Sequence, residues 1–337
     1  MKRTRFIFII ILVLLITFPK DALATTYLRL SETDRYKTAI AVNKELFPTG
    51  PYSDIPIVIA SGKDFPDALS GATLSCSILL TRGNILSEEV KNEIVRMGSS
   101  VIGILGGVAV ISAYMETQLR DLGVQVERIQ GQNRYETNVA IAEQVYNPKS
   151  AEAPAKIFIA SGENFPDALS SATPAILEGA VILLVQKDKI PNPVKNYLNS
   201  IDKGIEYIYI IGGEGVISSS VEERLKSYTS SITRIGGVNR YDTSYLIAQT
   251  FFSNLPFQEE SFLVFVSGEN FPDALPSGLL ATVSETPILL TQKNKLPTEI
   301  EKFVKKFDRQ KVNTAYIVGG EAVVSEQVVN DIKETLQ

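Results

Sequence analysis

The sequence predicts an α/β protein made of three tandem copies of one unit, each with a parallel β-sheet covered by helices. Two short phrases recur in step along the chain, which indicates that a whole folding unit has been repeated. The first phrase places Arg-Tyr-x-Thr six residues after another arginine, at residues 29–38, 128–137 and 234–243. The second phrase, Phe-Pro-Asp-Ala-Leu, occupies residues 65–69, 165–169 and 271–275. Spacings of 99 to 106 residues suit a small domain and are too long for a solenoid repeat.

The elements of the first unit follow from its apolar pattern, taken in chain order. Apolar residues recur at helical spacing in the segments interpreted as helices, whereas the segments interpreted as strands are short, continuous apolar runs. We expect helices at residues 35–47, 65–74, 87–97 and 112–122, and strands at residues 56–60, 77–81, 100–105 and 124–129. Gly106-Gly107 ends the third of these strands, and Gly123 ends the last helix.

The second and third units repeat this order. Their expected strands are at residues 156–160, 181–185, 207–213, 263–267, 287–291 and 315–320. Strands that are apolar throughout and alternate with helices are typical of parallel sheets with helices on both faces. We expect repeats at residues 25–127, 128–233 and 234–337. Because no flexible linker separates them, we expect compact packing with pseudo-threefold symmetry.

The two ends of the chain leave the pairing of the first strand open. A strand-like segment lies at residues 27–30, and the sequence ends with a helical pattern at residues 325–336. If each entering strand joins the sheet of the preceding repeat, residues 27–30 must complete the third sheet and close a ring. If each entering strand stays in its own repeat, no strand is exchanged. The apolar pattern is compatible with both arrangements.

The first 24 residues have the pattern of a secretory signal peptide. Three basic residues precede an apolar run at residues 6–18, and Ala22-Leu23-Ala24 fits a cleavage site. The apolar run is short against the roughly 20 residues that span a bilayer, so we expect a secreted protein without a stable membrane anchor after cleavage. Removing residues 1–24 changes the net charge from −5 to about −8, which disfavours nonspecific nucleic-acid binding.

Missing residue types and motifs restrict the chemistry. The sequence has no histidine, which excludes Ser-His-Asp and Cys-His catalysis and every zinc site that needs histidine. Cys76 is the only cysteine, so no intrachain disulfide forms, and its apolar neighbours indicate a buried side chain. No Walker phosphate loop or Gly-x-Gly-x-x-Gly segment occurs at a strand-to-helix junction. We therefore expect no enzyme activity, cofactor or metal.

Recurring polar residues follow the predicted strands, at the edge where open α/β sheets bind ligands. Each unit has Arg-Tyr after its first strand, Ser-Gly after its second strand, and an aspartate in the phrase Phe-Pro-Asp-Ala-Leu. The candidate ligand contacts are Arg35, Tyr36, Ser61, Gly62, Asp67, Arg134, Tyr135, Ser161, Gly162, Asp167, Arg240, Tyr241, Ser267, Gly268 and Asp273.

Structural roles for the same residues stay open. The three arginines also suit salt bridges between repeats. Asn or Asp before each Arg-Tyr is a natural N-terminal helix cap, at residues Asp34, Asn133 and Asn239. A second set of caps is expected at Asp64, Asn164 and Asn270, where the aspartate three positions later would complete a capping-box-like pair.

Carboxylates at this edge can in principle bind a divalent metal. Repeat 1 has Lys63 where the other repeats have Glu163 and Glu269, so no carboxylate pair recurs. Three equivalent edges without a nucleophile or base favour adhesion, because linking weak sites raises affinity by about 10²–10⁴.

Taken together, the ordered motifs R-[LI]-x-x-x-[DN]-R-Y-x-T, S-G-x-x-F-P-D-A-L, I-L-L and G-G resemble the cell wall binding repeat 2 (CWB2) family of Gram-positive bacteria, especially clostridia. The match runs from Tyr27 to the C-terminus. The resemblance implies three Rossmann- or Toprim-like repeats in a triangular module that holds surface proteins noncovalently on an anionic cell-wall polymer, beside or within the surface layer. It also implies polymer binding by a Pro-Ile-Leu-Leu segment, present here only as Pro287, Ile288, Leu289 and Leu290.

We therefore expect a secreted, noncatalytic cell-wall-binding protein at the cell surface. Its expected partners are an anionic cell-wall glycopolymer and surface-layer proteins. Family members usually carry a separate functional domain, whereas the repeats fill this chain. Two other functions stay open. One is a cell-wall hydrolase associated with amidase activity, or a metal-dependent enzyme that uses the edge carboxylates. The other is a surface-layer scaffold that self-associates.

Overall fold

The computed structural model describes residues 25–63, 66–253, 261–270, 272–307 and 311–336. The signal peptide expected at residues 1–24 lies outside the described residues. Repeat 1 contains β1 (Thr26–Leu30), α1 (Arg35–Leu46), β2 (Ile57–Ser61), α2 (Pro66–Gly71), η1 (Ala72–Leu74), β3 (Ser77–Thr81), α3 (Glu88–Met97), β4 (Val101–Leu105) and α4 (Ala113–Arg120). Repeat 2 begins with β5 (Gln125–Ile129) and continues with α5 (Arg134–Val145), β6 (Ala155–Ser161), α6 (Pro166–Ser170), α7 (Ala172–Leu177), β7 (Val181–Val185), α8 (Asn192–Asn199), β8 (Ile205–Ile211) and α9 (Ser219–Leu225).

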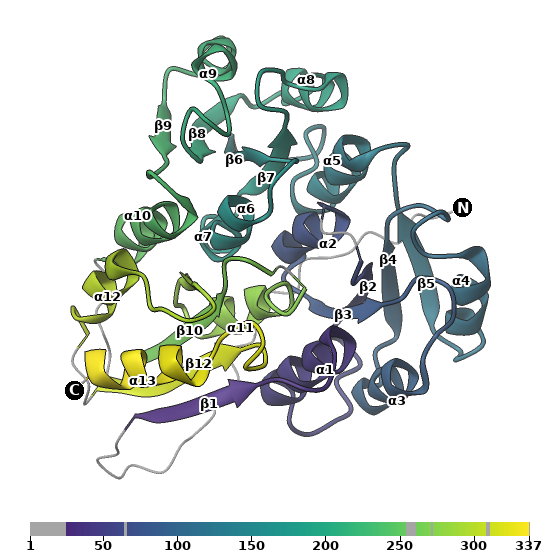
Figure 1. Cartoon of the computed structure of the whole chain (residues 1–337). Helices are drawn as coiled ribbons and strands as arrows, with labels where there is room; N and C mark the ends of the chain where they lie inside the picture. The colour runs from purple at the N-terminus through teal and green to yellow at the C-terminus, as the bar shows by residue number, and fades with distance from the viewer. Residues whose placement is uncertain (1–24, 64–65, 254–260, 271, 308–310, 337) are drawn as a thin grey trace.

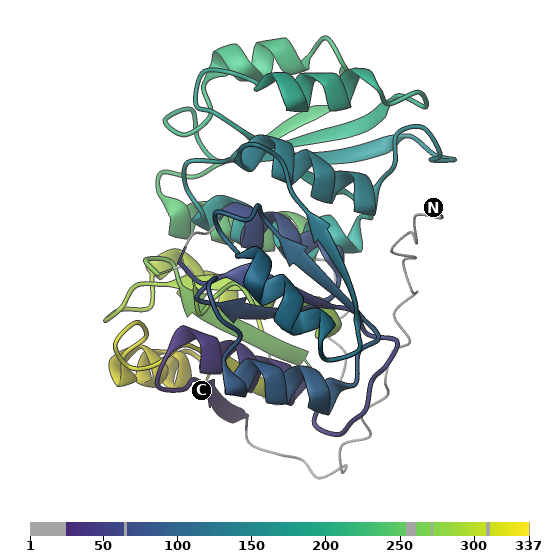
Figure 2. The ribbon, with the colours of Figure 1, turned by 90° about the vertical axis from the view of Figure 1, so that its right-hand side faces the viewer.

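Repeat 3 has the same order of strands and main helices, with turns at residues 272–276 in place of the helix equivalent to α2 and α6. It contains β9 (Ile232–Ile235), α10 (Arg240–Phe252), β10 (Ser261–Ser267), α11 (Ser277–Val283), β11 (Ile288–Thr291), α12 (Thr298–Val304), β12 (Val312–Val318) and α13 (Glu326–Thr335). The α/β prediction is confirmed, because the described strands form three four-stranded sheets in which every pairing is parallel. Figure 2 shows repeat 2, in teal and green, above the other two repeats.

The strand exchange is confirmed by the pairing of the first strand. The sheets have the orders β3-β2-β4-β5, β7-β6-β8-β9 and β1-β12-β10-β11. Each sheet therefore takes its outer strand from the following repeat, and β1 completes the sheet of repeat 3, with Tyr27 opposite Ala315 and Leu30 opposite Val318. In Figure 1 the purple β1 runs beside the yellow β12, so the first and last strands of the described chain meet in one sheet.

The first arginine of each repeat ties the exchanged strand to its host sheet. Arg29 donates through Nη1 to the carbonyl oxygens of Gly319, at 2.9 Å, and Val324, at 2.8 Å. It also forms an ion pair with Glu326 at 2.6 Å. The equivalent Arg128 and Arg234 donate to the carbonyls of Gly106 and Gly212, at 2.7 and 2.8 Å. The recurring Gly-Gly segments thus accept a guanidinium from the next repeat.

At the opposite edge of each sheet a helix covers the outermost strand. Helices α1, α5 and α10 pack on β3, β7 and β11, which shields these edges from pairing with another chain. In repeat 2 the buried Asn138 replaces a neighbouring strand, because its Nδ2 donates to Ile182 O at 2.8 Å and its Oδ1 accepts from Leu184 N at 2.9 Å. Ser244 binds the same two backbone positions of β11.

The core has one shared cluster and three separate ones. The shared cluster takes apolar side chains from all three repeats, including Leu69, Leu169 and Leu275 of the phrase Phe-Pro-Asp-Ala-Leu, all at most 1% exposed. Each repeat also has its own cluster on the other face of its sheet. Burial of apolar surface between the repeats is therefore what holds the compact pseudo-threefold arrangement together.

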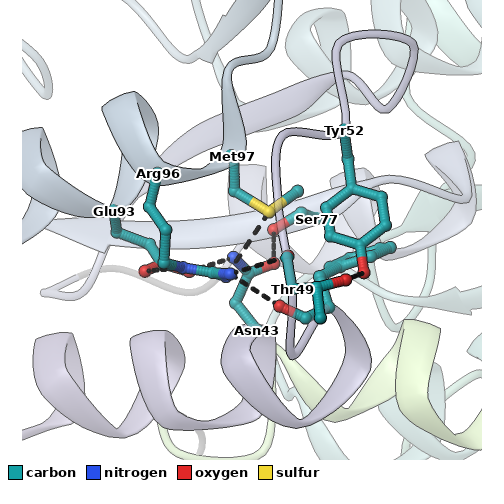
Figure 3. A network of polar contacts seen from close by, with 8 residues as sticks. Asn43, Thr49, Tyr52, Ser77, Glu93, Arg96 and Met97 are labelled. Atoms are coloured by element: carbon teal, nitrogen blue, oxygen red, sulfur yellow. Dashed lines mark hydrogen bonds and ion pairs between the residues drawn. The ribbon is translucent and has the colours of Figure 1, made fainter.

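Repeat 1 has a buried polar network centred on Asn43, a residue that the other two repeats do not have. Asn43 bonds to Glu93 and Ser77, and equivalent residues in repeats 2 and 3 are alanines. The Glu93 side chain is 1% exposed and pairs with Arg96 at 2.6 Å, while Arg96 also donates to Phe47 O at 2.7 Å (Figure 3). The network fixes the end of α1 and the following loop against α3.

One set of predicted caps is confirmed and the other is not. Asp34, Asn133 and Asn239 each accept hydrogen bonds from two backbone N–H groups at the start of α1, α5 and α10. The cap expected at Asn164 is wrong, because α6 begins at Pro166 and no side chain caps it. In repeat 3 residues 272–276 form turns, so the helix predicted there starts only at Ser277. Asp64 lies outside the described residues.

No helix in the described ranges has the length and apolar character needed to cross a membrane.

Candidate functional site

The Arg-Tyr and Ser-Gly motifs of each repeat meet at the carboxyl ends of the strands, as predicted. The capped N-terminus of the helix directs its first arginine toward the end of the second strand. Arg35 donates through Nη1 to Gly62 O at 2.6 Å. Equivalent bonds join Arg134 to Gly162 at 2.6 Å and Arg240 to Gly268 at 2.5 Å. We call the group formed by Asp34, Arg35, Tyr36, Ser61, Gly62, Lys63 and Arg82, and its equivalents in the other repeats, the rim.

In each rim a tyrosine ring lies so close to the glycine that no larger side chain fits there. A Cβ on Gly62 would lie 2.7 Å from Cε1 of Tyr36, and Gly162 and Gly268 are equally close to Tyr135 and Tyr241. The preceding serine is buried, and its hydroxyl accepts the backbone N–H two residues later at 3.1 Å in all three repeats. Ser-Gly therefore builds the turn that packs against the tyrosine of the helix, and the serine hydroxyl accepts a hydrogen bond within this turn.

The aspartates face the rim of the following repeat. Asp167 of repeat 2 lies near Arg240 and Thr243 of repeat 3, so two repeats contribute to its surroundings. Asp273 of repeat 3 is near Arg35 of repeat 1 in the same way. Burial raises the pKa of Asp167 to about 6, and the positive charge of Arg240 only partly offsets this. Burial also raises the pKa of Asp273.

Each aspartate also packs against the Gly-Gly turn of its own repeat. Gly106, Gly212 and Gly319 have φ values of +102°, +116° and +118°, a conformation that favours glycine. A Cβ on Gly106 would lie 2.5 Å from Oδ2 of Asp67, and the corresponding distance from Gly212 to Asp167 is 2.7 Å. Asp167 and Asp273 thus lie between the end of one sheet and the arginine of the next repeat, which explains their recurrence without helix capping.

Solvent reaches these rims. The side chains of Arg35, Tyr36, Arg134, Tyr135 and Arg240 are half-buried. Asp67 and Asp273 are also half-buried, whereas Asp167 and Tyr241 are 7% and 9% exposed. The candidate contacts are therefore partly accessible, and the rim of repeat 3 is the more closed among the three.

The Pro287–Leu290 segment has a different position from the other candidates. Pro287 is buried, and Ile288, Leu289 and Leu290 in β11 are fully buried. Ile288 and Leu290 belong to the core that the repeats share, while Leu289 belongs to the core of repeat 3. The segment packs the interior and presents no side-chain surface at the rim.

Two rim positions escaped the sequence analysis as ligand contacts. Arg82 follows β3, and its guanidinium lies over the Tyr36 ring, 4.4 Å from the centroid, while pairing with Asp34 at 3.2 Å. Lys63 follows Gly62 and is exposed. The signal that identifies them is a difference between the repeats, whereas recurrence indicates only the residues that the repeats share.

The arrangement suits hydrogen bonding to an anion. Guanidinium and phenol groups lie together at the carboxyl ends of the strands, and arginine matches carboxylate and phosphate geometry. Among the residues that the structure describes, no three histidine, cysteine, aspartate or glutamate side chains gather in a way that would hold a metal ion.

Two curated relatives align with most of this chain. N-acetylmuramoyl-L-alanine amidase LytC of Bacillus subtilis (strain 168) is 30% identical over 325 residues, which cover 95% of this chain and 60% of LytC. The amidase enhancer of the same organism is 28% identical over 299 residues, which cover 88% of this chain and 37% of the relative. The chain thus spans less than two thirds of either relative.

Solved structures share the fold. Cwp6 from Clostridium difficile superposes with a TM-score of 0.80 at 26% identity, over 93% of this chain and 48% of Cwp6. Cwp8 from the same organism gives a TM-score of 0.78 at 27% identity, over 92% of this chain and 52% of Cwp8. The profile of Cell wall binding domain 2 (CWB2) matches residues 29–116, 128–222 and 234–329, one match in each repeat. The chain belongs to the cell wall binding domain 2 family.

Proposed function

We propose that this protein is a noncatalytic cell-wall-binding protein that attaches to an anionic wall polymer at the cell surface. The observation that carries this proposal is the set of three Arg-Tyr pairs at the carboxyl ends of three parallel sheets, with all three arginines and the tyrosines of repeats 1 and 2 partly exposed. Membership of the CWB2 family supports attachment to the wall. The anionic nature of the ligand is inferred from the arginine chemistry of the rims.

Three rims on one rigid body suit a repetitive polymer. Each rim offers a guanidinium, a group with five N–H donors, and its Nη1 binds the glycine carbonyl. A single exposed arginine binds an anion weakly, but simultaneous engagement of linked sites raises affinity by about 10²–10⁴. The shared core holds the rims in fixed relation, so the ordering cost of binding falls mainly on the polymer.

Similarity to an amidase favours a second candidate function, the cleavage of wall material. LytC covers nearly the whole of this chain at 30% identity. The described rims offer a buried aspartate with a raised pKa at Asp167, which is a feature of some general acids. Asp167 nevertheless lies between repeats and 7% exposed, which is the position of a packing residue.

Wall sedimentation distinguishes these functions. The purified protein is mixed with isolated Gram-positive cell walls, and bound and free protein are separated by centrifugation. We expect sedimentation with walls and its loss after chemical removal of the anionic polymer. Release of soluble sugars or amines from the walls would instead favour the enzyme. Concentration-dependent assembly without walls would favour a self-associating scaffold.

The rim arginines can be tested directly. Replacing Arg35, Arg134 and Arg240 with lysine keeps the charge but removes the fork that can bind two oxygens at once. We expect weaker sedimentation with walls and only a small loss of thermal stability, from the bonds to the three glycine carbonyls. The matched control replaces the exposed Arg120 and Arg224 with lysine. A large loss of thermal stability in the rim variant alone would show that these arginines serve packing.

A further inference from the structure

The three rims have the same backbone but different charge. The four charge-bearing positions in repeat 1 are Asp34, Arg35, Lys63 and Arg82, with a net charge of +2. The equivalent residues in repeat 2 are Asn133, Arg134, Glu163 and Gln186, and those in repeat 3 are Asn239, Arg240, Glu269 and Gln292. Both of these sets are neutral overall. The aspartate of the phrase Phe-Pro-Asp-Ala-Leu is present in every repeat, so it does not alter the difference.

Contacts confirm that these positions are equivalent in space. Gly62, Gly162 and Gly268 each donate their backbone N–H at 2.9 Å to the last residue of the neighbouring strand, after which Arg82, Gln186 and Gln292 follow. In repeat 2 the charge of Glu163 and the side chain of Gln186 both act on Tyr135. In repeat 1 the guanidinium of Arg82 lies over the ring of Tyr36. The two variable positions therefore flank the rim tyrosine.

In repeat 3 a carboxylate of the protein itself already lies beside the rim tyrosine. The hydroxyl of Tyr241 donates to the carboxylate of Glu269 at 3.3 Å. Glu163 occupies the equivalent position in repeat 2. In repeat 1 that position is Lys63, so two cationic side chains, Lys63 and Arg82, flank Tyr36 where the other repeats place a carboxylate and an amide.

We propose that the rim of repeat 1 is the principal site for an anionic group of the polymer, held by Arg35, Lys63 and Arg82 with the Tyr36 hydroxyl as a further donor. This assignment rests on the proposed function. It goes beyond that function because it gives the three rims different affinities for an anionic group. A carboxylate or phosphate would be attracted by two more positive charges here than at either other rim. The carboxylates of Glu163 and Glu269 repel an anion and compete for the tyrosine donor.

The test exchanges residues between repeats. Lys63→Glu with Arg82→Gln gives repeat 1 the residues that repeats 2 and 3 have at these positions, so the fold is expected to tolerate them. The matched control, Lys203→Glu with Arg224→Gln, makes the same charge change at exposed positions away from the rims. Binding to isolated cell walls is measured by sedimentation over a range of salt concentrations, with thermal unfolding as a check on folding.

We expect the repeat 1 variant to lose about tenfold or more in affinity and part of its salt dependence, since it loses charge-assisted hydrogen bonds. The control should bind as the unaltered protein does. Equal binding by all three proteins would overturn the assignment to repeat 1 and leave the proposed function standing. Failure of the unaltered protein to bind walls would overturn both.

Two treatments of the walls identify the anion. Hydrofluoric acid cleaves phosphodiesters, whereas coupling an amine with a carbodiimide neutralises carboxylates. Loss of binding after one treatment assigns the ligand group to that source, and full binding after both treatments would refute an anionic ligand. A second variant, Glu163→Lys with Gln186→Arg, converts repeat 2 to the composition of repeat 1. Increased wall binding by this variant is expected, and unchanged binding would contradict the role given to these two positions.

Discussion

The buried carboxyl of Asp167 gives a pH dependence that can be calculated. Its pKa rises from 3.8 to about 6 in the folded protein, mainly because burial disfavours the charged form. Between these values the folded protein binds more protons than the unfolded chain, so the free energy of unfolding falls as pH rises through this window. This difference in pKa corresponds to about 3 kcal/mol of unfolding free energy. The contribution is present below about pH 4 and lost above about pH 6.

Asp167→Asn removes this group, so the stability difference between the unaltered protein and the variant should change by about 3 kcal/mol between pH 4 and pH 7. Urea unfolding followed by circular dichroism at several pH values measures the difference, and the comparison cancels the titration of all other groups. Asp188→Asn, at an exposed site, controls for the loss of one negative charge. A stability difference for Asp167→Asn that stays constant with pH would refute the assignment of a raised pKa to this carboxyl.

Three further predictions concern stability. Gly106→Ala should lower the free energy of unfolding by at least about 2 kcal/mol, because the φ of Gly106 is +102° and a methyl group would meet the carboxylate of Asp67. The control is Gly123→Ala, which has open space around a φ of +79° and should cost about 1–2 kcal/mol. Equal losses in urea unfolding would contradict the contact. Asn138→Ala should cost about 2–4 kcal/mol, since two buried backbone groups of β7 lose their partner; a loss below that range would show that water replaces the amide. Arg29→Met should cost a similar amount and reduce hydrogen-exchange protection at residues 312–318, its host strand. Protection lost only around Arg29 would indicate that β1 is dispensable to the third sheet.

Much of the fold was predictable because its signals are local. Continuous apolar runs specify buried parallel strands, and the β3 and β7 boundaries match the expected runs at residues 77–81 and 181–185. The N-terminal caps at Asp34, Asn133 and Asn239 were equally clear. The closure of the ring was foreseen only as one of two arrangements, because pairing between the first strand and β12 depends on the relative placement of whole repeats.

The site was less predictable for the same reason. Recurrence identified the Arg-Tyr and Ser-Gly motifs correctly as neighbours, but it does not separate a residue that binds from one that packs. The helix-capping role expected for the aspartates failed where it could be examined, because the partners of Asp167 and Asp273 come from another repeat. No pattern within one unit encodes a contact with the next unit. The charges that distinguish repeat 1 became informative only when the structure showed that they surround one tyrosine.

The closure of the third sheet by β1 has a consequence for how such a protein can arise and mature. Ribosomal synthesis makes β1 first, whereas its partner β12 emerges nearly a whole chain length later, so the opening strand must wait for its final position. Unit number is constrained as well. A gene duplication that adds a fourth unit, or a deletion that leaves two, would keep the two strands that pair at the closure. It would change the rotation between units that is needed to bring these strands together. Three units are thus the number at which the rotation between units brings β1 and β12 together in this structure.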